Sequence, residues 1–258
     1  MPVKAYDLTG RTSFVTGAAS GIGRSTAALL AEAGATVHCA DRDAQGLHET
    51  AALIKEAGGT AHTHTLDVSD HDQVAEAVAT AVETSGGLDI MAAIAGVMHS
   101  SPALETPDED LDRVLAINFK GVLYACQEAA RAMIAAGTRG SIVTMASGAV
   151  DTGGPGLLCY GAAKAAVVQL TKTLATEVGP HGIRVNAVAP GWIRTPMTTR
   201  HDESIQAHTE ALMVRMSPLG RVGAPDDIAH AVLHLASDAA AFTTGQILRP
   251  NGGVAMPW

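Results

Sequence analysis

Thr12-Ser13-Phe14-Val15-Thr16-Gly17-Ala18-Ala19-Ser20-Gly21-Ile22-Gly23 is the stretch that decides the fold of this chain. Residues 12–16 have the pattern of a short strand, and the apolar residues from Ala27 to Ala33, closed by Gly34, predict a helix. Glycines spaced as G-x-x-x-G-x-G let backbone approach a pyrophosphate, and the next helix offers unpaired N–H groups at its N-terminus. The stretch therefore predicts a dinucleotide-binding turn, although glycines that only turn the chain give the same spacing.

The alternation of strand and helix continues along the chain. Further strands are expected at 36–40, 60–66, 88–94, 140–146, 182–189 and 246–248, and further helices at 44–57, 70–84, 107–136, 157–178 and 224–236. Ser69 is the expected cap of the helix at 70–84. Such alternation predicts a parallel sheet with helices on both faces. We expect one domain over residues 1–258, with a substrate lid around 192–217.

Several polar or flexible residues fall where the predicted strands end. Gly17, Asp41, Asp67 and the turn 93–96 all occupy such positions, and ligands of parallel sheets bind beyond the carboxyl ends of the strands. Asp41 lies 24 positions after Gly17, near the spacing at which an acid meets the adenosine ribose hydroxyls. Asp41 favours NAD over NADP, whereas Arg42 leaves open the binding of a 2′-phosphate.

A second motif is Tyr160-Gly161-Ala162-Ala163-Lys164, which precedes an apolar run typical of a helix. On a helix Tyr160 and Lys164 share one face, about 5–6 Å apart at Cβ. A fixed ammonium favours a phenolate and lowers the phenol pKa from about 10. The pair is a candidate proton relay, with an ordinary surface pair as the alternative. Ser147, at the end of a predicted strand, is either a hydrogen-bond partner for a substrate oxygen or a cap.

Composition excludes several classes of protein. The chain has 258 residues, 17 Lys and Arg against 26 Asp and Glu, and no basic block, so we expect no nucleic-acid partner. No apolar run reaches the roughly 18 residues that span a bilayer, which predicts a cytoplasmic protein without membrane contact. Three cysteines without a CxxC spacing argue against a disulfide framework and a zinc site, so no metal is expected. We expect them in the core, with Cys159 partly accessible.

From Leu8 to Gly253 the chain resembles the short-chain dehydrogenase/reductase family, single-domain type. The resemblance rests on the TGxxxGxG stretch 16–23, Asn118, Ser147 with Tyr160 and Lys164, and the stretch 190–195, together with the spacing of 13 between Ser147 and Tyr160. It implies an α/β, Rossmann-like, doubly wound seven-stranded parallel sheet and a nicotinamide cofactor. It also implies a catalytic tetrad of Asn118, Ser147, Tyr160 and Lys164.

The motifs and the resemblance together predict the cofactor contacts. Asp67 and Val68 are expected beside the adenine, and Ile193 and Thr195 at the nicotinamide end. The full expected set is Gly17, Ser20, Gly21, Ile22, Gly23, Asp41, Arg42, Asp67, Val68, Ala95, Gly96, Tyr160, Lys164, Pro190, Gly191, Ile193 and Thr195. The resemblance further implies a homotetramer or homodimer, with residues 112–136 and 157–178 in the interface.

Two segments depart from the family pattern. Ala93 and Ile94 replace the usual Asn pair after the fourth strand, which removes hydrogen bonds that would steady this strand and the adjacent cofactor site. The segment Arg249-Pro250-Asn251-Gly252-Gly253 lacks the acid that usually precedes the two glycines. We expect the consequences of this second departure mainly in the subunit interface.

The sequence thus predicts an oxidoreductase that transfers a hydride between NAD(H) and a small secondary alcohol or ketone, with Tyr160 as general acid/base. Ser147 would hold the reacting oxygen, Lys164 would lower the pKa of Tyr160 and bond the nicotinamide ribose, and Asn118 would hold water in a proton path. One alternative is an NADP-dependent 3-oxoacyl reductase that uses Arg42. Another is a non-catalytic nucleotide-binding protein, which Ala93 and Ile94 make conceivable.

Overall fold

The computed structural model describes residues 4–199 and 203–257. Seven parallel strands form one sheet in the order β3-β2-β1-β4-β5-β6-β7. The strands are β1 (Thr12–Thr16), β2 (Thr36–Asp41), β3 (Thr60–Thr65), β4 (Ile90–Ala93), β5 (Ser141–Met145), β6 (Arg184–Val188) and β7 (Ile247–Leu248). The chain reverses its direction of winding between β1 and β4, which confirms the predicted doubly wound sheet and places a crevice between these strands.

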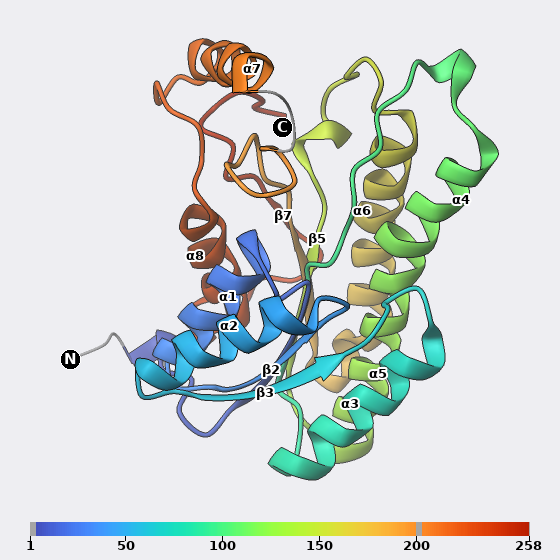
Figure 1. Ribbon diagram of the computed structural model, residues 1–258. Coiled ribbons are helices and arrows are strands. Elements are labelled where there is room, and N and C mark those ends of the chain that lie inside the picture. The colour runs from blue at the N-terminus through green and yellow to red at the C-terminus, as the bar shows by residue number, and fades with distance from the viewer. Residues whose placement is uncertain (1–3, 200–202, 258) are drawn as a thin grey trace.

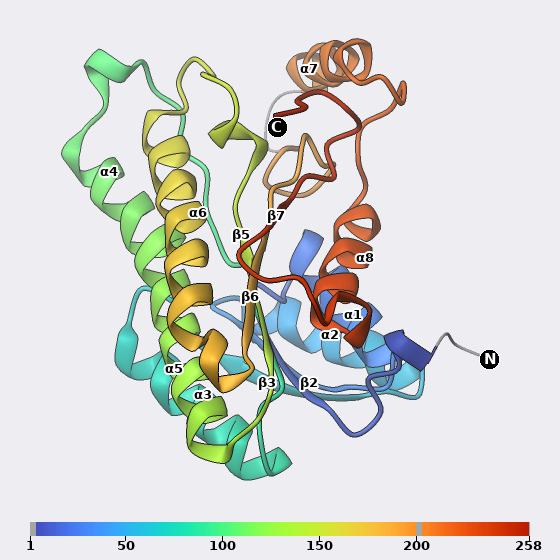
Figure 2. The ribbon, with the colours of Figure 1, turned by 180° about the vertical axis from the view of Figure 1, so that it is seen from behind.

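Helices cover both faces of the sheet (Figures 1 and 2). One layer contains α1 (Gly21–Glu32), α2 (Ala44–Glu56) and α8 (Pro225–Ala236), and the other contains α3 (His71–Ser85), α4 (Asp108–Leu115), α5 (Gly121–Ala136) and α6 (Leu158–Val178). A further helix, α7 (Glu203–Met216), lies away from the sheet near the C-terminal end of the chain (Figure 1). This helix belongs to the segment 192–217, which is expected to form a lid. Residues 200–202 of that segment, and residues 1–3 and 258 of the predicted domain, lie outside the described residues.

Two apolar clusters fill the space between sheet and helices. Phe14 and Val15 are neighbours on β1, and both are fully buried, but Val15 packs toward α1 and α8 whereas Phe14 packs toward α3 and α5. On β4, Ala92 belongs to the same cluster as Val15, and Met91 belongs to the same cluster as Phe14. Because successive strand side chains point to opposite faces, a strand covered on both faces is buried at every position, as β1 and β4 are.

The start of α3 differs from the prediction. Asp70, and not Ser69, caps the helix: its carboxylate accepts hydrogen bonds from the backbone N–H groups of Asp72 and Gln73. The Ser69 hydroxyl instead donates to Asp67 at 2.7 Å. Both residue types cap helices well, and the bond to Asp67 determines which of the two is available.

The segment expected as one helix at 107–136 is helical over 108–136, but it contains a π-helical turn. Between α4 and α5 the backbone forms a π-helical turn, Ala116–Lys120, with Asn118 buried inside it. Gly121 starts α5 against Val68, where an added Cβ would lie 2.9 Å from the valine Cγ2. The glycine therefore serves packing, whereas the asparagine lies in a local widening of the helix, a feature frequent at functional sites.

The remaining expectations concern membranes and cysteines. None of the helices that the structure describes is both long and apolar enough to cross a bilayer. Cys39, Cys126 and Cys159 are free thiols in the core. The expectation that Cys159 is partly accessible is wrong, because its side chain packs against Val114 and Ala163 between α4 and α6.

Candidate active site

The carboxyl ends of the central strands lie level with one another. Thr16, the last residue of β1, pairs with Ala40 on one side and with Ala93 on the other, and Ala93 pairs in turn with Thr144. The residues that follow these positions therefore meet at one edge of the sheet. This register brings together the glycine turn, Asp41, the turn after β4 and the segment that begins with Ala146.

The glycine-rich turn packs closely against two other predicted segments. Gly17 has a φ of +73°, and an added Cβ would lie 2.9 Å from the Cα of Ala95. At Gly21, which has a φ of +52°, an added Cβ would lie 3.3 Å from the Thr195 side chain. A Cβ at Gly23 would collide with the Gly17 carbonyl oxygen at 1.9 Å. These glycines are thus required sterically, and they place three predicted cofactor segments in contact.

The start of α1 suits a bound anion. Ser20 occupies the N-cap position with extended backbone, but its side chain makes no capping hydrogen bond to the first turn. The first N–H groups of a helix have no partner within the helix, and they carry its positive dipole end. The turn 17–23 therefore presents the N-terminus of a helix, which is an arrangement that can bind the pyrophosphate of a dinucleotide.

Asp41 ends β2 beside the same turn. One carboxylate oxygen accepts from the Ala19 N–H at 3.2 Å and the other from the Asp43 N–H at 3.1 Å. These bonds hold the carboxylate at the edge of the turn, where it can accept hydrogen bonds from ribose hydroxyls. The neighbouring Arg42 is exposed.

Asp67 and Val68 follow β3 on the same side of the sheet. The Asp67 carboxylate accepts hydrogen bonds from the backbone and hydroxyl of Ser69 at 2.9 and 2.7 Å. Val68 is buried among the side chains between the sheet, α3 and α5. The structure thus places Asp67 at the edge of the sheet, but it gives Val68 a packing contact with Gly121.

The turn after β4, which lacks the usual Asn pair, is held by Thr16. Its hydroxyl oxygen accepts hydrogen bonds from the backbone N–H groups of Ile94 and Ala95, at 3.0 and 3.2 Å. These bonds tie the end of β4 to the end of β1, next to the glycine turn. Thr16, the first residue of the TGxxxGxG stretch, therefore holds the turn after β4 in place.

Asn118 anchors the turn that follows β4 from the opposite side. Its side-chain oxygen accepts from the Val97 N–H and its amide donates to the Val97 carbonyl, both at 2.8 Å. Gly96 lies between this amide and Lys164: an added Cβ would sit 3.2 Å from the Asn118 oxygen and 3.5 Å from the Lys164 Nζ. The π-helical turn thus brings the predicted asparagine to within one small residue of the predicted lysine.

Tyr160 and Lys164 lie on the same face of α6, as the spacing predicts. The Lys164 Nζ is 5.7 Å from the centre of the Tyr160 ring and donates to the Met145 carbonyl at 2.7 Å. Only 2% of Lys164 is exposed. Burial lowers the pKa of this ammonium from 10.5 to about 8, because the charged form loses solvation.

The expected lowering of the Tyr160 pKa by Lys164 does not occur in this structure. Burial raises the pKa of the phenol, and a hydrogen bond from Ser147 acts in the opposite direction. The Lys164 Nζ donates instead to the Met145 carbonyl at the end of β5. The group that favours the phenolate here is therefore the serine hydroxyl.

Ser147 begins the 3₁₀ turn Gly148–Val150 directly after β5. Its side-chain oxygen accepts from the Ala149 N–H at 3.2 Å, which leaves the hydroxyl proton free to be donated. The Gly148 N–H donates to the Pro190 carbonyl at 2.8 Å, so the serine turn is attached to the segment after β6. Pro190, Gly191, Ile193 and Thr195 all belong to that segment, and Ile193 is buried.

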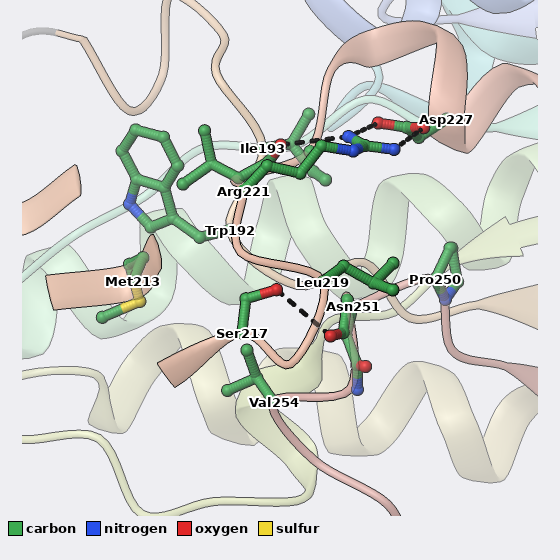
Figure 3. Close-up of a pocket in the computed structure, with 13 residues that line it drawn as sticks. Trp192, Ile193, Met213, Ser217, Leu219, Arg221, Asp227, Pro250, Asn251 and Val254 are labelled. Atoms are coloured by element: carbon green, nitrogen blue, oxygen red, sulfur yellow. Dashed lines mark hydrogen bonds and ion pairs between the residues drawn. The ribbon is translucent and has the colours of Figure 1, made fainter. Parts of the chain in front are cut away.

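A cavity of about 170 Å³ lies beside this segment (Figure 3). Trp192 and Met213 stand on one side of it, and the paired Arg221 and Asp227 border another. The cavity separates the start of the segment after β6 from the end of α7, and Tyr160 and Ser147 do not line it. Trp192 and Met213, which both belong to the predicted lid segment 192–217, thus line this cavity. In the described parts of the chain no group of three or more His, Cys, Asp or Glu could hold a metal ion.

Comparison with known proteins agrees with this geometry. A family model described as enoyl-(acyl carrier protein) reductase matches residues 17–255. The chain is 39% identical to the 3-oxoacyl-[acyl-carrier-protein] reductase of Thermotoga maritima, over 96% of this chain and 98% of that protein. It is 41% identical to the cis-4-hydroxycyclohexanecarboxylate dehydrogenase of Sinomonas cyclohexanicum, over 94% of this chain and 96% of that protein.

The fold leads to the same group of proteins. The crystal structure of a short-chain type dehydrogenase/reductase from Mycobacterium marinum superposes with a TM-score of 0.92 and 38% identity, covering 98% of both chains. The relatives are named for reactions at hydroxyl or keto groups. The chain therefore belongs to the short-chain dehydrogenase/reductase family, whose members are oxidoreductases that use NAD or NADP.

Proposed function

We propose that this enzyme transfers a hydride between NAD(H) and a secondary alcohol or the corresponding ketone, with Tyr160 as the general acid/base. The observation that carries the proposal is the arrangement around the phenol: the Ser147 hydroxyl lowers its pKa, and the Lys164 Nζ lies 5.7 Å from its ring. Phenol, hydroxyl and ammonium meet at the carboxyl edge of the sheet, where the glycine turn is built to hold a dinucleotide.

Each residue of the tetrad has a distinct role in this proposal. Ser147 donates its free hydroxyl proton to the substrate oxygen, and Tyr160 accepts the alcohol proton in oxidation or returns it in reduction. Lys164 spends one of its three N–H groups on Met145, which leaves two for a ribose hydroxyl and the phenol side. Asn118 holds the backbone of Val97 and thereby the turn against which Lys164 rests. The nicotinamide supplies the hydride acceptor or donor when bound.

NAD is the proposed cofactor because of Asp41. Its carboxylate is fixed by two backbone N–H groups, so it is ready to accept from the two adenosine ribose hydroxyls. A 2′-phosphate at the same position would bring two negative charges against it. Arg42 is exposed and offers no fixed partner to such a phosphate. The remaining expected contacts, from Gly17 to Thr195, belong to the same proposal.

The second candidate is a 3-oxoacyl reductase. It is favoured by the relative from Thermotoga maritima, whose name gives that activity on an acyl-carrier-protein substrate. The chemistry at the tetrad is the same in both cases, and the two differ in cofactor and in the length of the substrate. The lid at 192–217, the homotetramer or homodimer and the cytoplasmic location stay predictions from the sequence.

The test is turnover of NAD and NADP with a panel of secondary alcohols, cyclic ketones and 3-oxoacyl thioesters. We expect NAD-linked activity on alcohols, and Tyr160→Phe should reduce kcat by roughly two to four orders of magnitude while leaving NAD binding intact. Tyr6→Phe is the matched control, because Tyr6 bonds His234 far from the crevice. Activity of Tyr160→Phe equal to the wild type would refute the proposal, and activity with 3-oxoacyl thioesters and NADPH alone would favour the second candidate.

A further inference from the structure

Arg249, just after β7, forms a two-point ion pair with Asp151. The guanidinium Nε lies 2.7 Å from one carboxylate oxygen of Asp151, and Nη2 donates to the other at 3.1 Å. Nη1 donates to the Ile247 carbonyl at 3.0 Å, which fixes the arginine on its own strand. The Asp151 side chain is 8% exposed and that of Arg249 is 28% exposed. Arg249 thus has an ion-pair partner within its own chain, and the expected effect of the missing acid on a subunit interface stays a prediction.

Asp151 ends the 3₁₀ turn that Ser147 begins. The Asp151 N–H donates to the Gly148 carbonyl at 3.0 Å, and the Val150 N–H donates to the Ser147 carbonyl at 3.2 Å. With the bond from Ala149 to the Ser147 hydroxyl oxygen, these contacts make one compact unit of five residues. Residues 152–156, which follow it, contain three glycines and a proline, so the chain beyond Asp151 holds the turn only weakly.

The ion pair therefore clamps the far end of the serine turn to the sheet. At the near end the turn is held by β5 and by the bond from Gly148 to Pro190. A bidentate arginine–carboxylate contact adds directional restraint as well as energy, and a carboxylate this buried would be left without compensation if its partner were removed. Exposed pairs, by contrast, contribute little.

We infer that Arg249 is a positioning residue for catalysis: through Asp151 it fixes the turn that aims the Ser147 hydroxyl at Tyr160 and at the substrate oxygen. This inference rests on the proposed function. A positioning role, unlike a purely stabilising one, predicts a change in the deprotonation of Tyr160. The hydrogen bond from Ser147 favours the phenolate, so a looser serine must leave Tyr160 harder to deprotonate.

The experiment measures kcat, KM and the dependence of kcat on pH for Arg249→Met, Arg249→Lys and Asp151→Asn in the direction of alcohol oxidation. We expect kcat to fall roughly tenfold and its acidic limb, where activity is lost as Tyr160 becomes protonated, to move to higher pH, with the NAD dissociation constant unchanged. Arg249→Lys keeps the charge but cannot form the two-point contact, so it should show the same shift in a smaller degree. The charge exchange Asp151→Arg with Arg249→Asp should move the limb back toward the wild type.

Arg11→Met is the matched control, because Arg11 is 27% exposed and bonds Asp238 at the opposite end of the sheet. The inference is overturned if kcat and the pH limb of Arg249→Lys and Asp151→Asn equal those of the wild type, or if Arg11→Met shifts the limb equally. Should Arg249→Met not fold, the two conservative variants decide. Tyr160→Phe, assayed in parallel, separates the two hypotheses: if it remains active the proposed function fails, whereas an inactive Tyr160→Phe with unshifted Arg249 variants refutes the inference alone.

Discussion

Two regions of this protein bury titratable side chains, and they do so in different ways. One is the Tyr160–Lys164 pair on α6, where the ammonium is 2% exposed. The other is a cluster of three imidazoles on β2 and β3, formed by His38, His62 and His64, with His38 completely buried. Burial lowers the pKa of both Lys164 and His38, to about 8 and about 4 respectively. The same physical cause thus acts on both regions.

The difference lies in what each group is bonded to. His38 Nδ1 is 2.9 Å from His64 Nε2, and His38 Nε2 is 2.8 Å from the Ser85 hydroxyl, so both ring nitrogens have partners that suit a neutral imidazole. His62 stacks on the His38 ring at 4.7 Å. Lys164 has one protein partner for three donors. The imidazole cluster is complete within the chain, whereas the ammonium has bonds left for a ligand.

Position along the strands explains this difference. His38 and His62 are paired in the middle of β2 and β3, where both neighbours along the strand are fixed by the sheet. Lys164 reaches the carbonyl of Met145, the last residue of β5, and so lies at the edge where the sheet stops. Titratable groups in mid-strand are therefore structural in this fold, and those at the carboxyl ends are available for chemistry.

Among the residues of this comparison, the largest effect is expected for Lys164→Met. Loss of the ammonium removes the proposed contact to the nicotinamide ribose and a buried charge 5.7 Å from the Tyr160 ring, so kcat should fall by roughly two orders of magnitude. The comparison also predicts how the free energy of unfolding depends on pH. Between pH 8 and 10 the wild type should become more stable as pH rises, because the folded protein releases the lysine proton that the unfolded chain still binds. Lys164→Met should lack this rise.

Steady-state kinetics and urea unfolding at pH 8 and 10 check both parts. Lys172→Met is the control, since Lys172 lies on the same helix but is exposed. It should keep both the activity and the rise in stability. If Lys164→Met and the wild type had equal kcat, the prediction would be wrong, and Lys164 would have only a structural role, as the histidines have.

Asp41 is expected to give a smaller effect. Asp41 is the last residue of β2, and His38 lies three residues earlier, in the middle of the same strand. The two residues therefore allow an end position and a middle position to be compared on one strand. Asp41→Asn removes the charge that repels a 2′-phosphate, and the ratio of NADP to NAD affinity should rise by roughly tenfold to a hundredfold. Asp43→Asn is the control, because Asp43 caps α2 next to the turn. Titration of both cofactors into both variants checks this, and an unchanged ratio in Asp41→Asn would assign cofactor choice to other residues.

Much of this arrangement could be predicted from the sequence, because local patterns determine it. The alternation of strands and helices and the glycine spacing act over a few residues, and the parallel sheet then brings Gly17, Asp41 and Ser147 to one edge. The spacing of Tyr160 and Lys164 likewise fixes their shared helix face. The seven strands occur at the expected places, with differences of one or two residues at their ends.

The missed features depend on partners that are distant in sequence. Thr16 bonds to Ile94 across 78 positions, and Arg249 bonds to Asp151 across 98. His38 and His64 also meet only through strand pairing. Each of these residues looks ordinary in its own segment. The Lys164 ammonium was expected to act on the phenol, but its direction depends on a carbonyl at the end of β5 that no spacing along α6 reveals.

The smallest effect on activity is expected at the histidine cluster. His38→Gln keeps a donor and an acceptor in mid-strand, so kcat and KM at pH 7.5 should stay within about twofold of the wild type, because nothing at the carboxyl edge changes. Stability in acid should change instead. The His38 pKa is lowered to about 4, chiefly by burial and then by His64 and His62, whereas an unfolded histidine titrates near 6.5.

The sign of this effect follows from proton uptake. Between pH 6.5 and 4 the unfolded chain binds a proton that folded His38 does not, so the free energy of unfolding falls on acidification, by on the order of 3 kcal/mol over the whole range. His64, whose pKa is also lowered by burial and by His62, adds in the same direction. Urea unfolding at pH 7 and pH 5 should therefore show a smaller loss for His38→Gln than for the wild type. His48→Gln, at an exposed position of α2, should lose as much as the wild type. If His38→Gln instead lost activity at pH 7.5 with its stability intact, mid-strand position would no longer separate structural from functional groups.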